Sequence, residues 1–275
     1  MDGSAKRRGK RVTSWHLVGA QIAGFRKHAG MTQQELAAQL CISDDKMASI
    51  EQGRRPLHIA LAVQIDDLLD TKRALEVAVG KVPEREKFPV FAQDFIEYEQ
   101  DAVTLLWYEI QVVPGLLQTE QYARAVFECR YPPVEDETVD DWVAARMARQ
   151  KVWERRQPPR ANFVLEEAVL RRPLGGREVM RDQIRALRDL SELPCMGVQI
   201  MPMDCVPHAA LDGPMVLLET PDHDNLAYVE GQRISQLIDD PDEVSIYQQK
   251  YGMLRSQALS PWESTLLLDG LLGES

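Results

Sequence analysis

The stretch MTQQELAAQLCISDDKMASIEQGRRP, residues 31–56, decides the fold of the N-terminal part of the chain. Thr32 and Glu35 have the spacing of a capping box, in which the Thr hydroxyl and the Glu carboxylate each accept a backbone N–H, so a helix is predicted to begin here. That helix ends near Cys41, and Ser43 is a good N-cap for the next one. Two short helices separated by about three residues predict a helix-turn-helix, the motif that lays its second helix in the DNA major groove.

An amphipathic helix is predicted on each side of this stretch. The first ends at Gly30, and the last begins after the turn at Arg54-Arg55-Pro56. Their apolar residues recur at helical spacing: Val18, Ile22, Phe25 and Ala29 in the first, and Leu61, Ile65, Leu68 and Leu69 in the last. Residues 14–70 are therefore expected to form an all-α bundle behind a basic tail at 1–13.

The charge of the chain is divided unevenly. The net charge is −11, yet residues 1–55 contain ten Lys or Arg against five Asp or Glu, a local net of +5, which leaves −16 for the remainder. A basic end joined to an acidic body indicates a short module that meets phosphate and a larger part with another role. The alternative is a solvated basic tail on a helical bundle that binds no DNA.

The helices and their turn resemble the Xre-type DNA-binding domain of Cro and phage repressors over residues 14–70. The resemblance implies that Gln33, at the start of the second helix, touches a phosphate or a base edge, and that Arg54 and Arg55 hold the DNA backbone. It also implies that the early residues of the third helix face the groove: Ser43, Asp44, Asp45, Lys46 and Ser49.

The chain departs from that family's pattern in two places. Cys41 stands in the turn where many members carry Gly, and Asp44 and Asp45 stand where Gln or Arg is common. Acids in the first turn of a helix favour its dipole by about 0.3–1 kcal/mol each, although they repel phosphate and could instead accept from cytosine N4. Because stabilisation is favoured over base contact, we expect modest affinity per monomer and a homodimer that reads a palindromic operator.

A charged segment punctuated by prolines follows the bundle, and we place a linker at residues 71–90. Beyond it, helical and strand-like periods alternate, which predicts a larger α+β domain at 91–275. The expected strands are 104–113, 163–170, 197–201, 215–219 and 226–230, and the expected helices are 91–101, 119–129, 134–156, 177–193, 242–258 and 261–272. The predicted fold class is a multidomain chain with an all-α helix-turn-helix bundle followed by this mixed domain.

Several segments of the larger part resemble, in order, one known C-terminal domain. They include EIQVVPGLLQTEQYARAVF, VLEEAVLRRPLGGREVMRDQIRAL and DDPDEVSIYQQKYGMLRSQALSPWES, within residues 90–272. The domain follows an Xre-type helix-turn-helix in an actinobacterial family that includes WhiJ-like developmental regulators and Scr-type antitoxin-like proteins. The resemblance implies a regulator of development or antibiotic production, whose large domain dimerises, binds a signal or engages a small acidic protein encoded nearby.

Six residues of this domain could bind a ligand or a partner: Trp107, Tyr122, Arg146, Arg149, Glu166 and Glu230. The aromatic residues could line a pocket, the arginines could bind an anion, and the two glutamates could form an acid/base pair. In each case the more ordinary interpretation is favoured, namely core aromatics, a solvated helix face and a solvated strand face.

No common catalytic motif is found in the sequence. His-Glu-x-x-His, the phosphate-binding Gly-x-x-x-x-Gly-Lys and Gly-x-Ser-x-Gly are all missing, so we expect neither an enzyme nor a cofactor. One group, Cys195, Cys205, His208 and Asp212, could supply metal ligands, but its spacing matches no zinc motif and core thiols are favoured over a metal site.

The composition, with 44% apolar and 27% charged residues, is typical of a folded globular protein. No apolar run is long enough to span a bilayer, and no apolar region follows the basic N-terminus as in a secretory signal. We therefore expect a cytoplasmic, nucleoid-associated protein without a membrane partner.

The leading functional hypothesis is a sequence-specific DNA-binding regulator gated by a small partner protein or ligand at the second domain. The alternative is an antitoxin-like module that sequesters a small protein encoded by a neighbouring gene, with DNA binding secondary. An enzyme with an attached DNA anchor is the least favoured reading, because no nucleophile, base or metal motif supports it.

Overall fold

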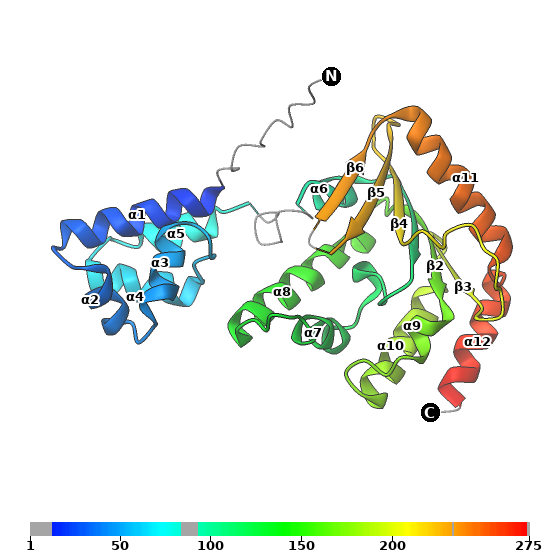
Figure 1. Cartoon of the computed structure of the whole chain (residues 1–275), viewed down its shortest axis with the longest axis horizontal. Helices are drawn as coiled ribbons and strands as arrows, with labels where there is room; N and C mark the ends of the chain where they lie inside the picture. Colours follow the sequence, from blue (N-terminus) through cyan, green and yellow to red (C-terminus); the bar gives the residue numbers. More distant parts are fainter. Residues whose placement is uncertain (1–12, 84–92, 233, 274–275) are drawn as a thin grey trace, which may run out of the picture. The chain divides into compact units, whose positions relative to one another are not determined.

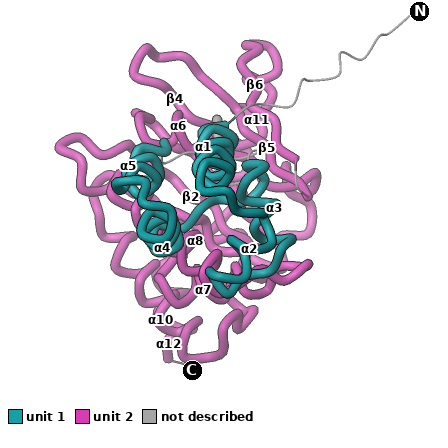
Figure 2. The backbone as a smooth tube through the Cα atoms, turned by 90° about the vertical axis from the view of Figure 1, so that its left-hand side faces the viewer, with its two compact units in different colours: residues 1–87 teal, residues 88–275 magenta. Residues whose placement is uncertain are grey.

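The computed structural model describes residues 13–83, 93–232 and 234–273. The chain divides into two compact units, Met1–Lys87 and Phe88–Ser275, which Figure 2 shows in different colours. Each unit has a hydrophobic core of its own, so each is described separately.

The first unit is all-α, as predicted (Figure 1). Apolar residues from successive helices meet in one core, where Ile22, Leu36, Met47 and Ile65 are fully buried. The helices are α1 (Ser14–His28), α2 (Gln33–Gln39), α3 (Asp44–Glu51), α4 (Ile59–Leu69) and α5 (Ala74–Gly80). The four predicted helices are therefore present, and a fifth helix, α5, follows them in the chain.

The fifth helix, α5, lies inside the range 71–90 that the sequence predicted to be a linker. Leu75 of α5 is fully buried in the core of the first unit. The carboxylate of Asp66, on α4, accepts the backbone N–H groups of Leu75 and Glu76 at 3.0 and 2.8 Å, and so caps the start of α5. A cap that comes from nine residues upstream has no local sequence signature. Residues 84–90 of the expected linker and 1–12 of the expected tail lie outside the described residues.

The second unit is built on a six-stranded sheet with the order β3-β2-β1-β4-β5-β6. β1 pairs in parallel with β2, and β2 with β3, whereas β4, β5 and β6 continue the sheet in antiparallel pairs from β1. The strands are β1 (Thr104–Glu109), β2 (Arg160–Glu166), β3 (Met196–Met201), β4 (Met215–Glu219), β5 (Asn225–Gly231) and β6 (Ile234–Ile238). The larger α+β domain predicted from the sequence is thus confirmed.

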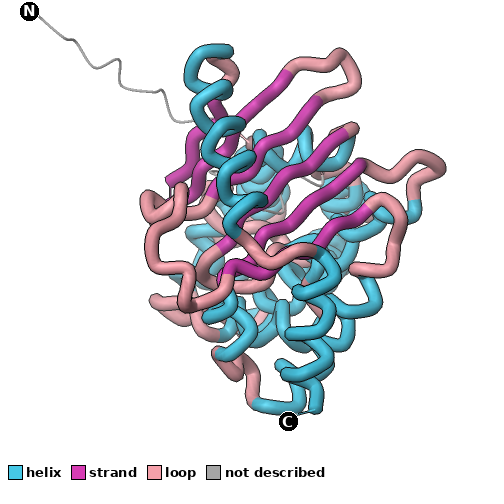
Figure 3. Tube along the Cα trace, turned by 90° about the vertical axis from the view of Figure 1, so that its right-hand side faces the viewer, coloured by secondary structure: helices cyan, strands magenta, loops and turns pink. Residues whose placement is uncertain are grey.

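Helices cover both faces of this sheet. One face packs against α6 (Gln93–Asp101), α7 (Glu120–Glu128), α9 (Glu167–Arg171), α10 (Arg177–Leu190), α12 (Pro261–Gly273) and two 3₁₀ helices, η3 (Gly115–Leu117) and η4 (Gln150–Glu154). The other face packs against α11 (Pro241–Gln257), which crosses the strands in Figure 3. α8 (Asp136–Arg149) packs against α7 in a smaller cluster.

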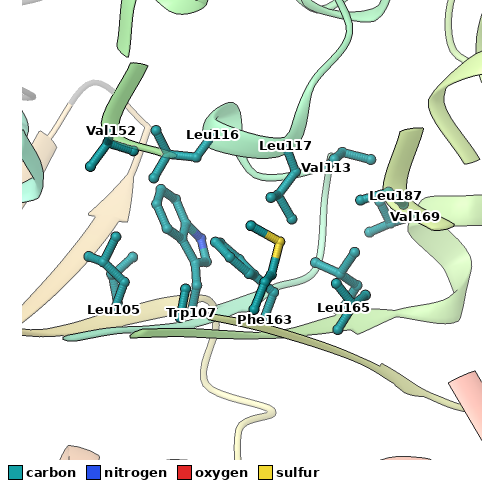
Figure 4. Packing of buried hydrophobic residues seen from close by; sticks show 14 of the residues in the cluster. Leu105, Trp107, Val113, Leu116, Leu117, Val152, Phe163, Leu165, Val169 and Leu187 are labelled. Carbon is teal, nitrogen blue, oxygen red and sulfur yellow. The ribbon is translucent and has the colours of Figure 1, made fainter. Parts of the chain in front are cut away.

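Alternation along the strands sends neighbouring residues into different layers. Trp107 and Phe163 lie on the face that η3 covers, where Leu116 and Leu117 stand above them in Figure 4. Tyr108 and Val164, one residue further along each strand, belong to the core beneath α11.

The structure corrects three of the predicted elements. The strand expected at 163–170 ends at Glu166, and the helix α9 begins at Glu167, whose carboxylate pairs with Arg171 one turn later at 2.6 Å. The helix expected at 134–156 tightens into η4 after Arg149, and the strand expected at 104–113 ends at Glu109. Strand β6 was not predicted. Among the described residues, no helix combines the length and the apolar character that a membrane span requires.

Candidate functional site

Capping side chains define both helices of the helix-turn-helix. Glu35 accepts the backbone N–H of Thr32 at 2.7 Å, and the backbone N–H of Glu35 is donated to the Thr32 hydroxyl at 3.2 Å. The hydrogen bond from the Thr32 backbone N–H is the main cause that lowers the pKa of the Glu35 carboxyl. Ser43 accepts the backbone N–H of Lys46 at 3.2 Å, which caps α3. The capping box and the N-cap that the sequence predicted are both present.

Glu51, at the end of α3, ties the three helices of this region together. Its carboxylate receives Arg26 Nε at 2.6 Å and Nη2 at 2.9 Å from α1, and Gln33 Nε2 at 2.8 Å from α2. Arg26 also donates to the carbonyl of Met31, before α2. The sequence analysis did not single out Arg26 and Glu51, because the burial of both side chains follows only from the packing of α1 against α3.

The predicted DNA-contacting residues lie on α2, on α3 and in the turn after it. The side chain of Gln33 is held by Glu51, and the hydroxyl of Ser43 is used as a cap. Exposed residues are Ser43, Asp44, Asp45 and Arg54, and partly exposed residues are Gln33, Lys46, Ser49 and Arg55. The first turn of α3 therefore exposes the carboxylates of Asp44 and Asp45 to solvent. This exposure is compatible both with a base contact and with stabilisation of the helix.

The turn between α2 and α3 contains a left-handed residue. Cys41 has φ +54°, a conformation in which a side chain crowds the following carbonyl and for which glycine is usual. The helix-turn-helix geometry is therefore reached with a non-glycine residue at the position where the sequence departs from the Xre-type pattern.

The described helical unit carries no net charge. Residues 13–83 contain eight Lys or Arg and eight Asp or Glu. Of the net charge of +5 on the first 55 residues, +4 therefore lies on residues 1–12, which have five basic residues and one acid. The excess positive charge that could attract phosphate thus lies mainly in residues 1–12 of the sequence.

In the second unit, the structure separates the six candidate residues into two groups. Glu166 ends β2 on the α11 side, where its carboxylate accepts from Tyr108 Oη at 2.7 Å and lies 3.6 Å from His208 Nε2. Desolvation, helped by Glu166, raises the pKa of Tyr108. Trp107 lies on the other face together with Tyr228, and Glu230, two residues further along β5, shares that side of the strand. Glu166 and Glu230 therefore do not form the acid/base pair that the sequence left open, in agreement with the interpretation favoured there.

Trp107 and Tyr122 belong to the buried core, which was the more ordinary interpretation. Trp107 packs edge-on against Phe95 and lies near Phe163, while the Tyr122 hydroxyl accepts the backbone N–H of Val113 at 3.2 Å. Trp107 and Tyr122 therefore support the packing of η3 on the sheet.

Glu230, in contrast, is exposed, and its carboxylate accepts a hydrogen bond from Tyr228 Oη at 2.8 Å.

The two arginines of α8 differ in their surroundings. Arg149 donates to both oxygens of Glu99, at 2.8 Å from Nε and 2.5 Å from Nη2, and Glu99 is fully buried. Arg146 donates from Nη1 to Gln118 Oε1 at 2.8 Å, and its guanidinium lies 4.8 Å from the centre of the Phe127 ring. Both arginines thus point into the protein, which differs from the solvated face favoured by the sequence.

An open cleft of about 600 Å³ lies elsewhere, where the β4–β5 turn meets the start of α11. None of the candidate residues lines it. Its lining includes Asp224 and Asp239, and no Lys or Arg: Tyr98, Thr220, His223, Asp224, Asn225, Leu226, Asp239, Pro241, Val244 and Gln248. Within the described part of the chain, no three His, Cys, Asp or Glu residues are grouped as metal ligands.

Comparison with known families divides the chain as the structure does. A helix-turn-helix domain matches residues 17–78, and a domain of unknown function, DUF5753, matches residues 92–270. No curated protein and no solved structure matches the chain. Because the second match spans more than half of the 275 residues, the chain belongs to the DUF5753 family, with a helix-turn-helix domain at its N-terminal end.

Proposed function

We propose that the protein is a sequence-specific transcription regulator that binds double-stranded DNA as a homodimer and reads a palindromic operator with α3. The capped helix-turn-helix carries this proposal, since Glu51 holds α1, α2 and α3 in one arrangement and leaves the first turn of α3 exposed. Such a role places the protein at the nucleoid.

We further propose that the DUF5753 domain gates DNA binding by taking up a small ligand or a small acidic partner protein encoded nearby. The resemblance to developmental regulators suggests development or antibiotic production as the process. The proposal includes no catalytic step and no cofactor.

The first experiment measures binding of the full chain to its own upstream DNA at two salt concentrations, with and without the small protein encoded next door. Salt-sensitive binding with preference for a palindrome is expected. Arg54→Ala is expected to weaken binding to all sequences alike, whereas Lys46→Ala or Ser49→Ala is expected to change which site is preferred. Lys81→Ala, which removes one exposed charge at the end of α5, is the matched control. Binding that ignores salt and sequence would exclude the regulator.

The neutral charge of residues 13–83 and the exposed pair Asp44 and Asp45 favour a second candidate. In that case the protein is an antitoxin-like module that sequesters a small neighbour-encoded protein, and DNA binding is secondary. Co-purification of that neighbour, with loss of DNA occupancy, would support this candidate. Full operator affinity of the protein alone, unchanged by the neighbour, would exclude it.

A further inference from the structure

Arg146 lies beside η3, the 3₁₀ helix that follows the inner strand β1. β2 pairs with one side of β1, and β4, later in the chain, pairs with the other. After β1 the chain forms η3 and then Gln118, whose side-chain oxygen accepts a hydrogen bond from Arg146.

The guanidinium of Arg146 has unused hydrogen-bonding capacity. Nη1 donates to Gln118, and one face of the planar guanidinium lies over the Phe127 ring, but Nε is buried and has no hydrogen-bond partner among the described residues. The described acids form no ion pair with Arg146, since Glu99, the buried acid of this region, receives both of its hydrogen bonds from Arg149. A buried donor without a partner is rare in native proteins and calls for an explanation.

This arrangement is costly for a cation. Burial lowers the pKa of the Arg146 guanidinium, and the nearby charge of Arg149 lowers it further. Arginine nevertheless remains protonated at neutral pH, so the desolvation cost stays with the folded protein until an anion compensates it.

The surroundings hold the guanidinium in place. A Cβ atom on Gly115 would lie 2.8 Å from Arg146 Nη1, so glycine at this position makes room for the head group. Gln118, which is buried, is fixed by its own donation to the carbonyl of Val113 at 2.6 Å. Gln150 donates to the carbonyls of Gly115 and Gln118, which secures the segment around η3. Arg146 is therefore preorganised rather than loosely placed.

We propose that Arg146 binds the carboxylate of a small organic acid through the Nε edge of its guanidinium. A planar fork of N–H donors matches a carboxylate in two parallel hydrogen bonds. The charge of Glu230 is close enough to act on Arg146, and it repels a doubly charged phosphate more strongly than a singly charged carboxylate. Coupling of this site to DNA occupancy rests on the proposed regulatory function, whereas binding of the acid does not.

The test follows the side-chain Nε–H resonance of Arg146 by nitrogen–proton NMR on the full chain, identified as the resonance that disappears in Arg146→Lys. The probes are sodium acetate, sodium benzoate and inorganic phosphate, each compared with chloride at equal ionic strength. We expect acetate or benzoate to shift the resonance saturably. We also expect the same probe to raise the melting temperature of the wild type and of Arg124→Gln, but not of Arg146→Gln. Arg124 is the matched control because it pairs with Asp140 on the surface.

An unmoved Nε resonance with both carboxylates would overturn the proposal, as would an equal rise in melting temperature for Arg146→Gln. A response to phosphate alone would overturn the carboxylate class. If Arg146→Gln fails to fold, the wild-type resonance still decides. DNA affinity measured with and without the probe separates the two proposals: a site that binds carboxylate without changing DNA affinity stands alone, and a chain that binds no DNA removes the regulator but not the site.

Discussion

Arg26 and Glu51 are 25 residues apart and form a two-pronged ion pair, with both side chains about nine-tenths buried. The pair joins the last turn of α1 to the last turn of α3, and Gln33 adds α2 through the same carboxylate. The position of α3 in the motif therefore depends on Glu51, which lies at the opposite end of that helix from its exposed first turn.

Replacing Glu51 with Gln is expected to destabilise the helical unit by about 3 kcal/mol, because it leaves the buried Arg26 without its counter-charge. Urea unfolding, followed by helix content, measures the change. The double variant Arg26→Met with Glu51→Leu is the control, since removing both charges should cost less than removing one. Equal losses in the single and double variants would show that packing, rather than charge, is responsible.

Cys41→Gly is expected to stabilise the protein by about 0.5–1 kcal/mol. Glycine removes the crowding at φ +54°, which costs an L-residue about 1–2 kcal/mol, and loses part of that gain to its greater freedom in the unfolded chain. The melting temperature reports the difference. Cys41→Ala keeps a Cβ atom in the same conformation and should show no such gain, so an equal gain in both variants would point to the thiol instead.

The N-terminal segment is expected to supply much of the phosphate attraction. Replacing Lys6, Arg7 and Arg8 with Gln should reduce the slope of log affinity against log salt by up to about 2.7, at about 0.9 for each lost phosphate contact. Fluorescence anisotropy with labelled DNA measures the slope. The matched triple change at exposed Lys27, Lys72 and Lys81 removes the same charge from the helical unit. An identical effect of both triples would mean that only net charge matters.

Asp44→Asn and Asp45→Asn separate the two roles considered for these carboxylates. If they only stabilise α3 through its dipole, each change costs about 0.3–1 kcal/mol of stability and raises affinity for all DNA sequences. If one of them accepts from cytosine N4, its replacement lowers operator affinity while non-specific affinity rises. We expect the first outcome, and competition between operator and random DNA distinguishes them.

Glu167 is expected to make the second unit sensitive to acid. Burial alone would raise the pKa of its carboxyl, but hydrogen bonds from the Met203 backbone and from Arg171 outweigh that effect and lower the pKa below its usual 4.5. Because the folded-state pKa is depressed, the stabilisation is present above pH 4.5 and is lost as the pH falls through the folded-state value. Urea midpoints measured across this range should fall less steeply for Glu167→Gln than for wild type.

Local signals account for what the sequence predicted well. The capping box at Thr32, the N-cap at Ser43 and the strand at Met215–Glu219 are each specified by residues close together in the chain, and all are found. The helix α5 was missed because its cap, Asp66, lies outside the segment that it caps.

The candidate site in the second unit depended on contacts that no local pattern encodes. Arg149 and Arg146 share one helix and one residue type, yet one meets Glu99, 50 residues away, and the other does not. Only the packed structure distinguishes them, because burial and pairing are set by the elements that converge on α8. The same holds for Glu166, which the pleat of β2 places on the opposite face from Glu230.

The position of β1 in the sheet sets an order for biosynthesis. Thr104 is paired with Arg160 on one side and with Glu219 on the other, so both neighbours of β1 leave the ribosome long after it does. The antiparallel strands β4, β5 and β6 form from adjacent segments, whereas β1 must wait for two long loops to close. The helical unit, complete within the first third of the chain, can fold while the central strand of the sheet is still unpaired.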